Sequence, residues 1–367
     1  MTPETPPAFK DHDLVPGHTF CEGLTYERRP LRDPSGAEVP DLFSAWISLN
    51  NPKQFNAYTT PMARDLILAL RKASNERDVV AVVITGAGER AFCTGGNTKE
   101  YAEYYSGSPS EYQQYLRLFV DMISGLLHCD KPVICRVNGM RIAGGQEIGL
   151  ACDVSISSDL AVFGQAGPKH GSAPDGGSTD MLALFVGIER AMQSATFCEM
   201  WTAYEAQRYG LLTEVVPVLE EDGAVVSNPT VETTRWLDER GQVVHGRPLS
   251  GDALRAGKDR LKAGSVNLEH LDRAVEATLW RFANTFPDCL RKTIESLRKQ
   301  KLELWNRNKE TSRSWLSLNM MTEGRLGFRA FNEGPKDKRR IDFLELRRRL
   351  AAGERWSEEF IDSLIPR

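Results

Sequence analysis

Two glycine-rich loops are the stretches of this chain best suited to chemistry. They are residues 93–96 (CTGG) and 143–145 (AGG), and each comes soon after a strand-like apolar run and precedes a helix. Backbone N–H groups freed at such turns can together hold one oxygen that gains negative charge, as an enolate or tetrahedral oxyanion does. Glu147 stands in the first turn of the second helix, where it can move protons. The alternative is a pair of packing turns, with a glutamate that only complements the helix dipole.

Other kinds of site are not indicated. Neither loop has the form GxxxxGK followed by Ser or Thr, and no GxGxxG opens a strand–helix–strand unit, so phosphate and dinucleotide loops are excluded. No cluster of His, Cys, Asp or Glu has the spacing of metal ligands, and we expect no metal. The net charge of −4 argues against a nucleic-acid partner. We expect the arginines between positions 339 and 349 to form a solvated basic face.

The cysteines and the hydropathy bear on the compartment. The seven cysteines are odd in number and include no CxxC pair, which is typical of reduced thiols in a reducing compartment. The start of the chain has no secretory leader pattern, and no stretch approaches the ~18 apolar residues that span a bilayer. We therefore expect a cytoplasmic protein with no membrane partner.

The elements that position the loops alternate between strands and helices. Residues 42–49 predict a strand, 62–75 an amphipathic helix and 79–85 a strand buried on both faces, which together form a right-handed crossover. The pattern recurs with a helix at 109–128 and strands at 132–137 and 154–157. Each turn of chain supplies β elements and then a helix, so an α/β spiral is favoured over a single open sheet.

Four regions follow from composition. Residues 1–20 are an arm rich in proline and charge, and 21–218 hold the spiral core. Residues 219–265 are a polar insert of unassigned role, in which a hairpin is possible around positions 239–241. Residues 266–367 are expected to be almost entirely helical.

Five stretches together resemble the enoyl-CoA hydratase/isomerase (crotonase) superfamily. The resemblance implies a crotonase-type ββα spiral core followed by a C-terminal helical trimerisation domain, assembled as a homo-hexamer that is a dimer of trimers. It also implies an acyl-CoA substrate and no separate cofactor, since CoA enters as part of the thioester. The stretches are NPKQFNA (51–57), AFCTGGNTKEY (91–101), VNGMRIAGGQEIGLACDVSISS (137–158), FGQAGPKHGSAPDGGST (163–179) and YGLLTEVVP (209–217).

The same resemblance assigns roles to single residues. It places the oxyanion-hole amides at Thr94 and Gly144, and the first catalytic glutamate of the hydratases at Glu147. The second hydratase glutamate is missing, because its position falls at Gly167. A carboxylate reappears at Asp175, near the aspartates of dienoyl-CoA isomerases and naphthoyl-CoA synthases, so the resemblance pairs it with Glu147 for acid–base work. Asp-Gly-Gly is also ordinary turn chemistry, which is the alternative.

Three further assignments concern a histidine and contacts to CoA. His170 is the only one of the six histidines within these motifs, and it is a candidate to orient a water or a carbonyl, although a loop histidine is as often simply exposed. Family analogy places CoA contacts at the backbone near Phe55 and Ala57. It also places the segment that contains Lys336 near the CoA of the same or an adjacent chain.

The total length, GPKHGSAPDGGSTDM and NTKEYAEYY resemble the 6-oxocyclohex-1-ene-1-carbonyl-CoA hydrolases of anaerobic benzoyl-CoA degradation. That resemblance implies water addition to the conjugated C=C bond and hydrolytic ring opening to 3-hydroxypimeloyl-CoA. One alternative is a cyclase like dihydroxynaphthoyl-CoA synthase, which FGQAGPKHGS favours. A plain enoyl-CoA hydratase is disfavoured by Gly167, and an idle CoA-thioester-binding assembly module is disfavoured because Glu147 and Asp175 are both present.

Overall fold

Two β-sheets form the core of the protein, of which residues 10–367 are described from a computed structural model. The larger sheet has six strands in the order β1-β2-β3-β5-β7-β10, and the smaller has four in the order β4-β6-β8-β9. The large-sheet strands are β1 (Leu24–Arg32), β2 (Glu38–Leu49), β3 (Val79–Gly86), β5 (Val133–Val137), β7 (Val154–Ser158) and β10 (Glu214–Val216). The small-sheet strands are β4 (Ala91–Cys93), β6 (Met140–Ile142), β8 (Val162–Gly164) and β9 (Trp201–Thr202).

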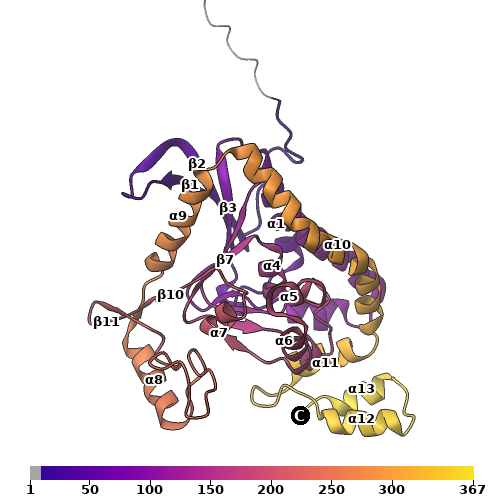
Figure 1. Ribbon diagram of the computed structural model, residues 1–367. Coiled ribbons are helices and arrows are strands. Elements are labelled where there is room, and N and C mark those ends of the chain that lie inside the picture. The colour runs from indigo at the N-terminus through magenta and orange to yellow at the C-terminus, as the bar shows by residue number, and fades with distance from the viewer. Residues whose placement is uncertain (1–9) are drawn as a thin grey trace, which may run out of the picture.

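The chain winds between the sheets as a spiral. Each turn gives one strand to the large sheet, the next to the small sheet, and then a helix, as in β5, β6 and α4. Strands β2, β3, β5 and β7 pair in parallel, which confirms the predicted crossovers and the α/β class (Figure 1). The helices of this part are α1 (Thr60–Asn75), α2 (Thr98–Glu100), α3 (Pro109–Leu127), α4 (Gly144–Ala151), α5 (Ser178–Val186), α6 (Ile188–Met192) and α7 (Ala203–Arg208).

Both faces of the central strands of the large sheet are buried. Successive side chains of a strand point to opposite faces, and here they enter two separate apolar clusters. Ile47, Val82 and Cys135 pack with α1, α3 and α4, whereas Trp46 and Val83 pack on the other side against α9 (Glu269–Ala283). This explains the continuous apolar runs in the sequence, since neither face of these strands meets water.

The C-terminal region is helical, as predicted. After α9 come α10 (Pro287–Asn319), α11 (Glu323–Glu333), α12 (Phe343–Ala351) and α13 (Glu358–Leu364). The long α10 lies along the core beside α3 and α5 (Figure 1). Arg298 of α10 is buried and donates to the Asp153 carboxylate at 2.7 and 2.5 Å, and Trp305 donates to the Ser124 hydroxyl at 3.0 Å. These bonds tie α10 to the spiral core.

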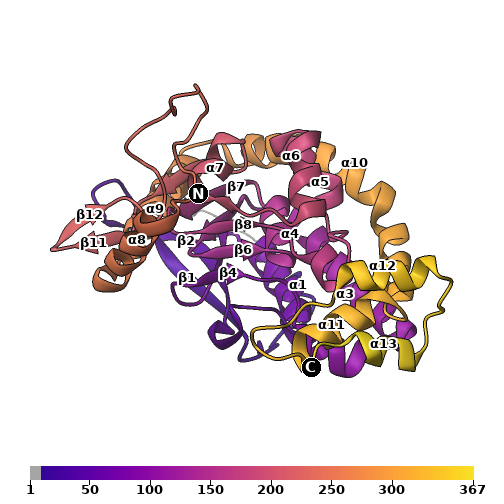
Figure 2. The same ribbon diagram turned by 90° about the horizontal axis from the view of Figure 1, so that it is seen from below.

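The insert differs from its prediction in one respect. Its strands are β11 (Leu219–Glu221), β12 (Ala224–Val226) and β13 (Ser265–Val266), and its helix is α8 (Gly251–Ala263). A hairpin that the sequence did not indicate turns at Asp222-Gly223, where both residues have positive φ as a tight two-residue turn requires. The hairpin predicted around positions 239–241 is present as a short one: Leu237 and Val243 form an antiparallel bridge, and the Asp238 and Val244 N–H groups donate to the Gln242 and Trp236 carbonyls at 2.9 and 2.8 Å. The Asp238 carboxylate closes its turn by accepting from the amides of Arg240 and Gln242. The insert and the last three helices, α11 to α13, lie on opposite sides of the core (Figure 2).

Two further points concern the N-terminal arm and the apolar character of the helices. Positions 1–9 of the predicted arm lie outside the described residues, and 10–20 contain no helix or strand, although His18 lies 3.1 Å from the Asp65 carboxylate. None of the helices within residues 10–367 is long and apolar enough to cross a membrane.

Candidate active site

The second glycine loop opens α4 in a strained conformation. Ala143 joins β6 to α4 with φ 52° and ψ −124°, a region that residues with a Cβ rarely occupy. Its own N–H donates to the Gly164 carbonyl of β8 at 3.1 Å, which holds the turn in place. The amides that begin α4 have no acceptor within the helix, so the Gly144 N–H is free to hold an anion.

The two glycine loops touch backbone to backbone. A Cβ placed on Gly95 would lie 3.1 Å from the Gly144 nitrogen, and one on Gly145 would lie 2.1 Å from the Cys93 carbonyl oxygen. Only glycine permits this approach. The loops that the sequence singled out separately, about fifty positions apart, are therefore one structure.

The first loop offers two amides, of which the sequence pointed to only one. Tyr58 donates its N–H to the Gly95 carbonyl and accepts from the Asn97 N–H, both at 2.9 Å. Because the Gly95 C=O and the Gly96 N–H share one planar peptide, the Gly96 N–H points away from the Tyr58 backbone. Within residues 10–367 the N–H groups of Thr94 and Gly96 have no acceptor. Gly96 thus joins Thr94 as a candidate donor.

Glu147 is held inside the site by the loop that precedes α5. Its side chain is buried, and its Oε1 accepts from the Gly176 N–H at 3.0 Å. Burial raises the pKa of Glu147 to about 8, and the negative charges of Asp175 and Asp180 add to the rise, while the Gly176 amide opposes it. A carboxyl group with a pKa near neutrality can both give and take a proton at physiological pH.

Asp175 is the residue directly before Gly176, so the structure brings the predicted acid–base pair together. Its Oδ1 accepts from the Thr179 hydroxyl at 2.9 Å, and its side chain is partly exposed. The Glu147 carboxyl group is therefore shielded from water, whereas the Asp175 carboxyl group is in contact with solvent. This difference in environment suits two carboxyl groups to different proton-transfer roles.

His170 lies apart from this pair in its described contacts. It ends a short 3-10 turn, Gly167–His170, with Nδ1 2.9 Å from the Ala166 carbonyl and its ring edge-to-face with Phe331 of α11 at 5.0 Å. Burial lowers its pKa, and the charges of Arg340 and Lys169 add to the effect. The ring is therefore neutral near pH 7, and because a carbonyl can only accept, Nδ1 carries the proton and Nε2 is left as an acceptor.

The predicted CoA contacts fall in two places. The Phe55 carbonyl accepts from the Thr94 hydroxyl at 3.4 Å, so the segment that contains Phe55 and Ala57 adjoins the first glycine loop. Arg90 lies over the Phe55 ring at 4.5 Å. Lys336 is exposed in the connection between α11 and α12.

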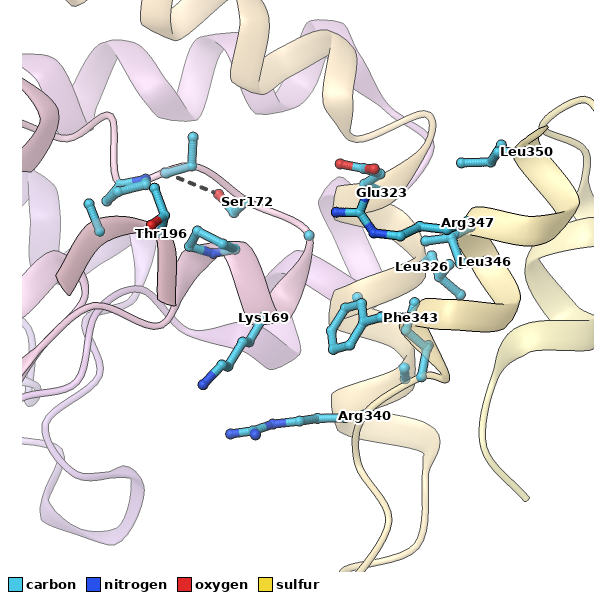
Figure 3. A pocket seen from close by; sticks show the side chains of 18 of the residues that line it. Lys169, Ser172, Thr196, Glu323, Leu326, Arg340, Phe343, Leu346, Arg347 and Leu350 are labelled. Carbon is cyan, nitrogen blue, oxygen red and sulfur yellow. Dashed lines mark hydrogen bonds between the residues drawn. The ribbon is translucent and has the colours of Figure 1, made fainter. Parts of the chain in front are cut away.

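A pocket of about 470 Å³ lies between the loop before α5 and the C-terminal helices. Its walls include Pro174 and Thr179 on one side and Phe343 and Leu346 of α12 on the other. Lys169 and Arg340 extend along the same edge of it (Figure 3). Arg339 and Arg347 also line it, so the predicted basic face is in part the wall of a pocket rather than a merely solvated surface.

A third carboxylate, Asp180, was missed in the sequence. It is 5 % exposed, its Oδ1 accepts from Asn308 of α10 at 2.6 Å, and its Oδ2 is buried with no partner within residues 10–367. Burial raises its pKa to about 6, and the charge of Asp175 adds to the rise. The only sequence signal was its position, one helical turn after Gly176.

We expect Asp180→Asn to move the Glu147-dependent limb of the pH–rate profile to lower pH. Asp180 is ionised above about pH 6 and its negative charge raises the Glu147 pKa, so removing that charge lowers it. Initial rates measured from pH 5 to 10 test this, with Asp121→Asn on the exposed face of α3 as the matched control. An unmoved limb, or one displaced to higher pH, would contradict the electrostatic coupling.

Comparison with known proteins gives one family and three near-full-length relatives. A family model described as enoyl-CoA hydratase/isomerase matches residues 44–242. A protein of Thauera aromatica named 6-oxocyclohex-1-ene-1-carbonyl-CoA hydrolase is 58% identical over 98% of this chain and 96% of its own. Proteins of the same name from Geobacter metallireducens and Syntrophus aciditrophicus are 56% and 48% identical, over 98% and 93% of this chain and 96% and 90% of their own.

Solved structures agree on the fold. The crystal structure of an enoyl-CoA hydratase from Bacillus halodurans has a TM-score of 0.62 at 18% identity, covering 84% of this chain and 99% of that one. An enoyl-CoA hydratase/isomerase from Mycobacterium paratuberculosis has the same TM-score at 17% identity, covering 85% and 99%. The described architecture is thus shared with proteins of distant sequence.

Proposed function

Because the chain belongs to the enoyl-CoA hydratase/isomerase family, we propose that it is a hydrolase that opens the ring of 6-oxocyclohex-1-ene-1-carbonyl-CoA. The observation that carries the proposal is the identity of 48–58% to three proteins of that name over 93–98% of this chain. The site is compatible with it, because its free amides and carboxyl groups suit reactions through a thioester enolate. The product would be 3-hydroxypimeloyl-CoA, and the pathway would be anaerobic benzoyl-CoA degradation.

The first step is addition of water across the C=C bond conjugated with the thioester. Attack of the water oxygen pushes electrons onto the thioester oxygen, and the resulting enolate is held by the Gly144 N–H together with that of Thr94 or Gly96. Glu147 handles the proton that this step moves, since it is dry and its pKa of about 8 leaves both protonation states accessible. No separate cofactor is needed, because CoA is part of the substrate.

The second step is hydrolysis of the carbon–carbon bond beside the ring ketone. Asp175 activates a water that attacks the ketone carbon, whereas the part predicted for His170 in this step has no support in its described contacts, which are to Ala166 and Phe331. Cleavage then expels a thioester enolate, so the same amides serve again. Glu147 and Asp175 can exchange these roles without changing the chemistry.

CoA contacts and assembly complete the proposal. The backbone near Phe55 and Ala57 adjoins the enolate site and would hold the pantetheine end, with Lys336 near the nucleotide. We propose a homo-hexamer in the cytoplasm, built as a dimer of trimers. Exposed apolar side chains support association, namely Leu184, Ile188, Met192, Leu318 and Met321.

The test is to incubate the purified protein with the cyclic enone thioester and follow the acyl-CoA products by mass. We expect the gain of two waters, and gain of a single water that never proceeds to ring opening would refute the hydrolase. Asp175→Asn should slow at least one of the two steps by roughly 10²–10⁴. Asp288→Asn on the exposed start of α10 is the matched control, and full activity of Asp175→Asn would remove Asp175 from the mechanism.

A further inference from the structure

Tyr58 lies at the junction of the two glycine loops. Its backbone bonds to the first loop, through the Gly95 carbonyl and the Asn97 N–H. Its side chain reaches the second, since a Cβ placed on Gly144 would lie 2.2 Å from the Tyr58 hydroxyl oxygen and 3.0 Å from the ring carbons beside it. The hydroxyl therefore sits directly beside the amide that we assign to the enolate.

This hydroxyl is unpaired although the residue is 3 % exposed. The neighbouring tyrosines are satisfied, because Tyr101 and Tyr115 share a hydrogen bond of 2.6 Å and Tyr105 bonds to Thr60 at 2.7 Å. The Tyr58 hydroxyl makes no hydrogen bond within residues 10–367, and because its oxygen is not among the fully buried side-chain atoms that lack a partner, it keeps some accessible surface. An unpaired hydroxyl donor that is still accessible and lies beside the Gly144 amide is in position to donate to a ligand atom.

The Tyr58 ring is held in place by packing, and its hydroxyl group keeps its proton. Tyr58 stacks on Phe119 of α3 with ring centroids 6.0 Å apart and planes inclined by 20°. Burial raises the pKa of Tyr58 far above its ordinary value, with smaller contributions from Tyr101 and from the Glu147 carboxylate. The hydroxyl is thus a positioned donor at any physiological pH.

If the proposed function holds, the substrate itself provides the hydrogen-bond acceptor for the Tyr58 hydroxyl. In 6-oxocyclohex-1-ene-1-carbonyl-CoA the ketone carbon is bonded to the carbon that carries the thioester. The two carbonyl oxygens therefore lie side by side when both point the same way. We propose that the Gly144 amide takes the thioester oxygen and that the Tyr58 hydroxyl donates a hydrogen bond to the ring ketone oxygen, which makes Tyr58 a catalytic residue of the ring-opening step.

The step balances without any further reagent. A water oxygen bonds to the ketone carbon, its proton goes to a carboxylate of the site, and the ketone π electrons move to the oxygen held by Tyr58. The C=O bond then re-forms, the ring carbon–carbon bond breaks, and its electron pair becomes the thioester enolate. Protonation of that carbon and ionisation of the new carboxylic acid complete the reaction.

Tyr58→Phe tests this, because it removes only the hydroxyl. We expect hydration to persist while ring opening slows by about 10²–10³, the usual cost of losing one oxyanion donor, so that the single-water adduct accumulates. Tyr26→Phe is the matched control, since that hydroxyl bonds to Glu76 away from the site. Ring opening by Tyr58→Phe at the wild-type rate would overturn the proposal.

A second substrate keeps the test independent of folding. Cyclohex-1-ene-1-carbonyl-CoA has no ketone and can only be hydrated. We expect Tyr58→Phe and the wild type to hydrate it equally, whereas equal slowing of Tyr58→Phe on both substrates would refute a ketone-specific role. If the wild type itself never opens the ring, the proposed function fails instead, which separates the two ideas.

Discussion

Replacing Glu147 with Gln is expected to slow turnover by roughly 10²–10⁴, the range of general acid–base catalysis. Gln keeps an Oε1 that can accept from the Gly176 N–H, so the loop before α5 retains its anchor while proton transfer is lost. Single-turnover rates of hydration and ring opening measure the effect. Glu303→Gln on the exposed face of α10 is the matched control, and turnover of the Glu147 variant within a few-fold of wild type would remove Glu147 from the reaction.

The same variant is expected to be more stable than the wild type at alkaline pH. The Glu147 pKa is raised from 4.5 to about 8, so the folded protein keeps a proton that the unfolded chain releases, and the wild type loses stability as pH rises through this window. Below about pH 4.5 the two should be equal, and above pH 8 the variant should gain at most about 5 kcal/mol. Thermal unfolding at fixed protein concentration measures this, and parallel pH profiles would contradict it.

Gly145→Ala is expected to abolish most activity by separating the two glycine loops. A Cβ at Gly145 would lie 2.1 Å from the Cys93 carbonyl oxygen and 2.7 Å from its carbon, which are backbone atoms that cannot rotate away. The amides on the two loops would then no longer reach the same oxygen. Loss of one oxyanion donor typically costs 10²–10³ in rate, and we expect at least that.

Gly125→Ala is the control for this change. On α3 the added Cβ would meet only a Leu70 methyl at 3.4 Å, an ordinary contact, and alanine favours the helix by up to about 1 kcal/mol. Circular dichroism and activity together separate misfolding from loss of the site. Near-wild-type turnover by Gly145→Ala would mean that the contact between the loops is not needed for catalysis.

Much of the fold could be predicted because its signals are local. The apolar run of β3 and the helical spacing in α1 each lie within a few positions, and the Gly144–Glu147 spacing lies within one helical turn. The spiral arrangement followed from their repetition. The arm, core, insert and helical divisions remain predictions, since no observation here tests those boundaries.

The parts of the site that could not be predicted depend on contacts between distant positions. No short stretch of the sequence indicates that the Gly176 N–H binds Glu147, or that the charge of Asp180 affects the Glu147 pKa. Nor does any indicate that the Tyr58 hydroxyl lies beside Gly144. Likewise the role of Gly96 emerged only once Tyr58 fixed the orientation of its peptide. The types of side chain in a sequence indicate a reaction only when the fold that brings those side chains together is known.

The small sheet affects the distance between the two glycine loops. The two glycine loops leave the ends of β4 and β6, which are neighbours in that sheet. Adjacent strands lie about 4.8 Å apart, so the two loops start about that far from each other, and an oxygen about 2.9 Å from each of two nitrogens can join N–H groups up to about 5.8 Å apart. Strand pairing in the small sheet thus sets the distance between the starts of the two loops. That spacing is the same for any sequence, so strand pairing keeps the two loops close together whichever acyl group the surrounding side chains admit.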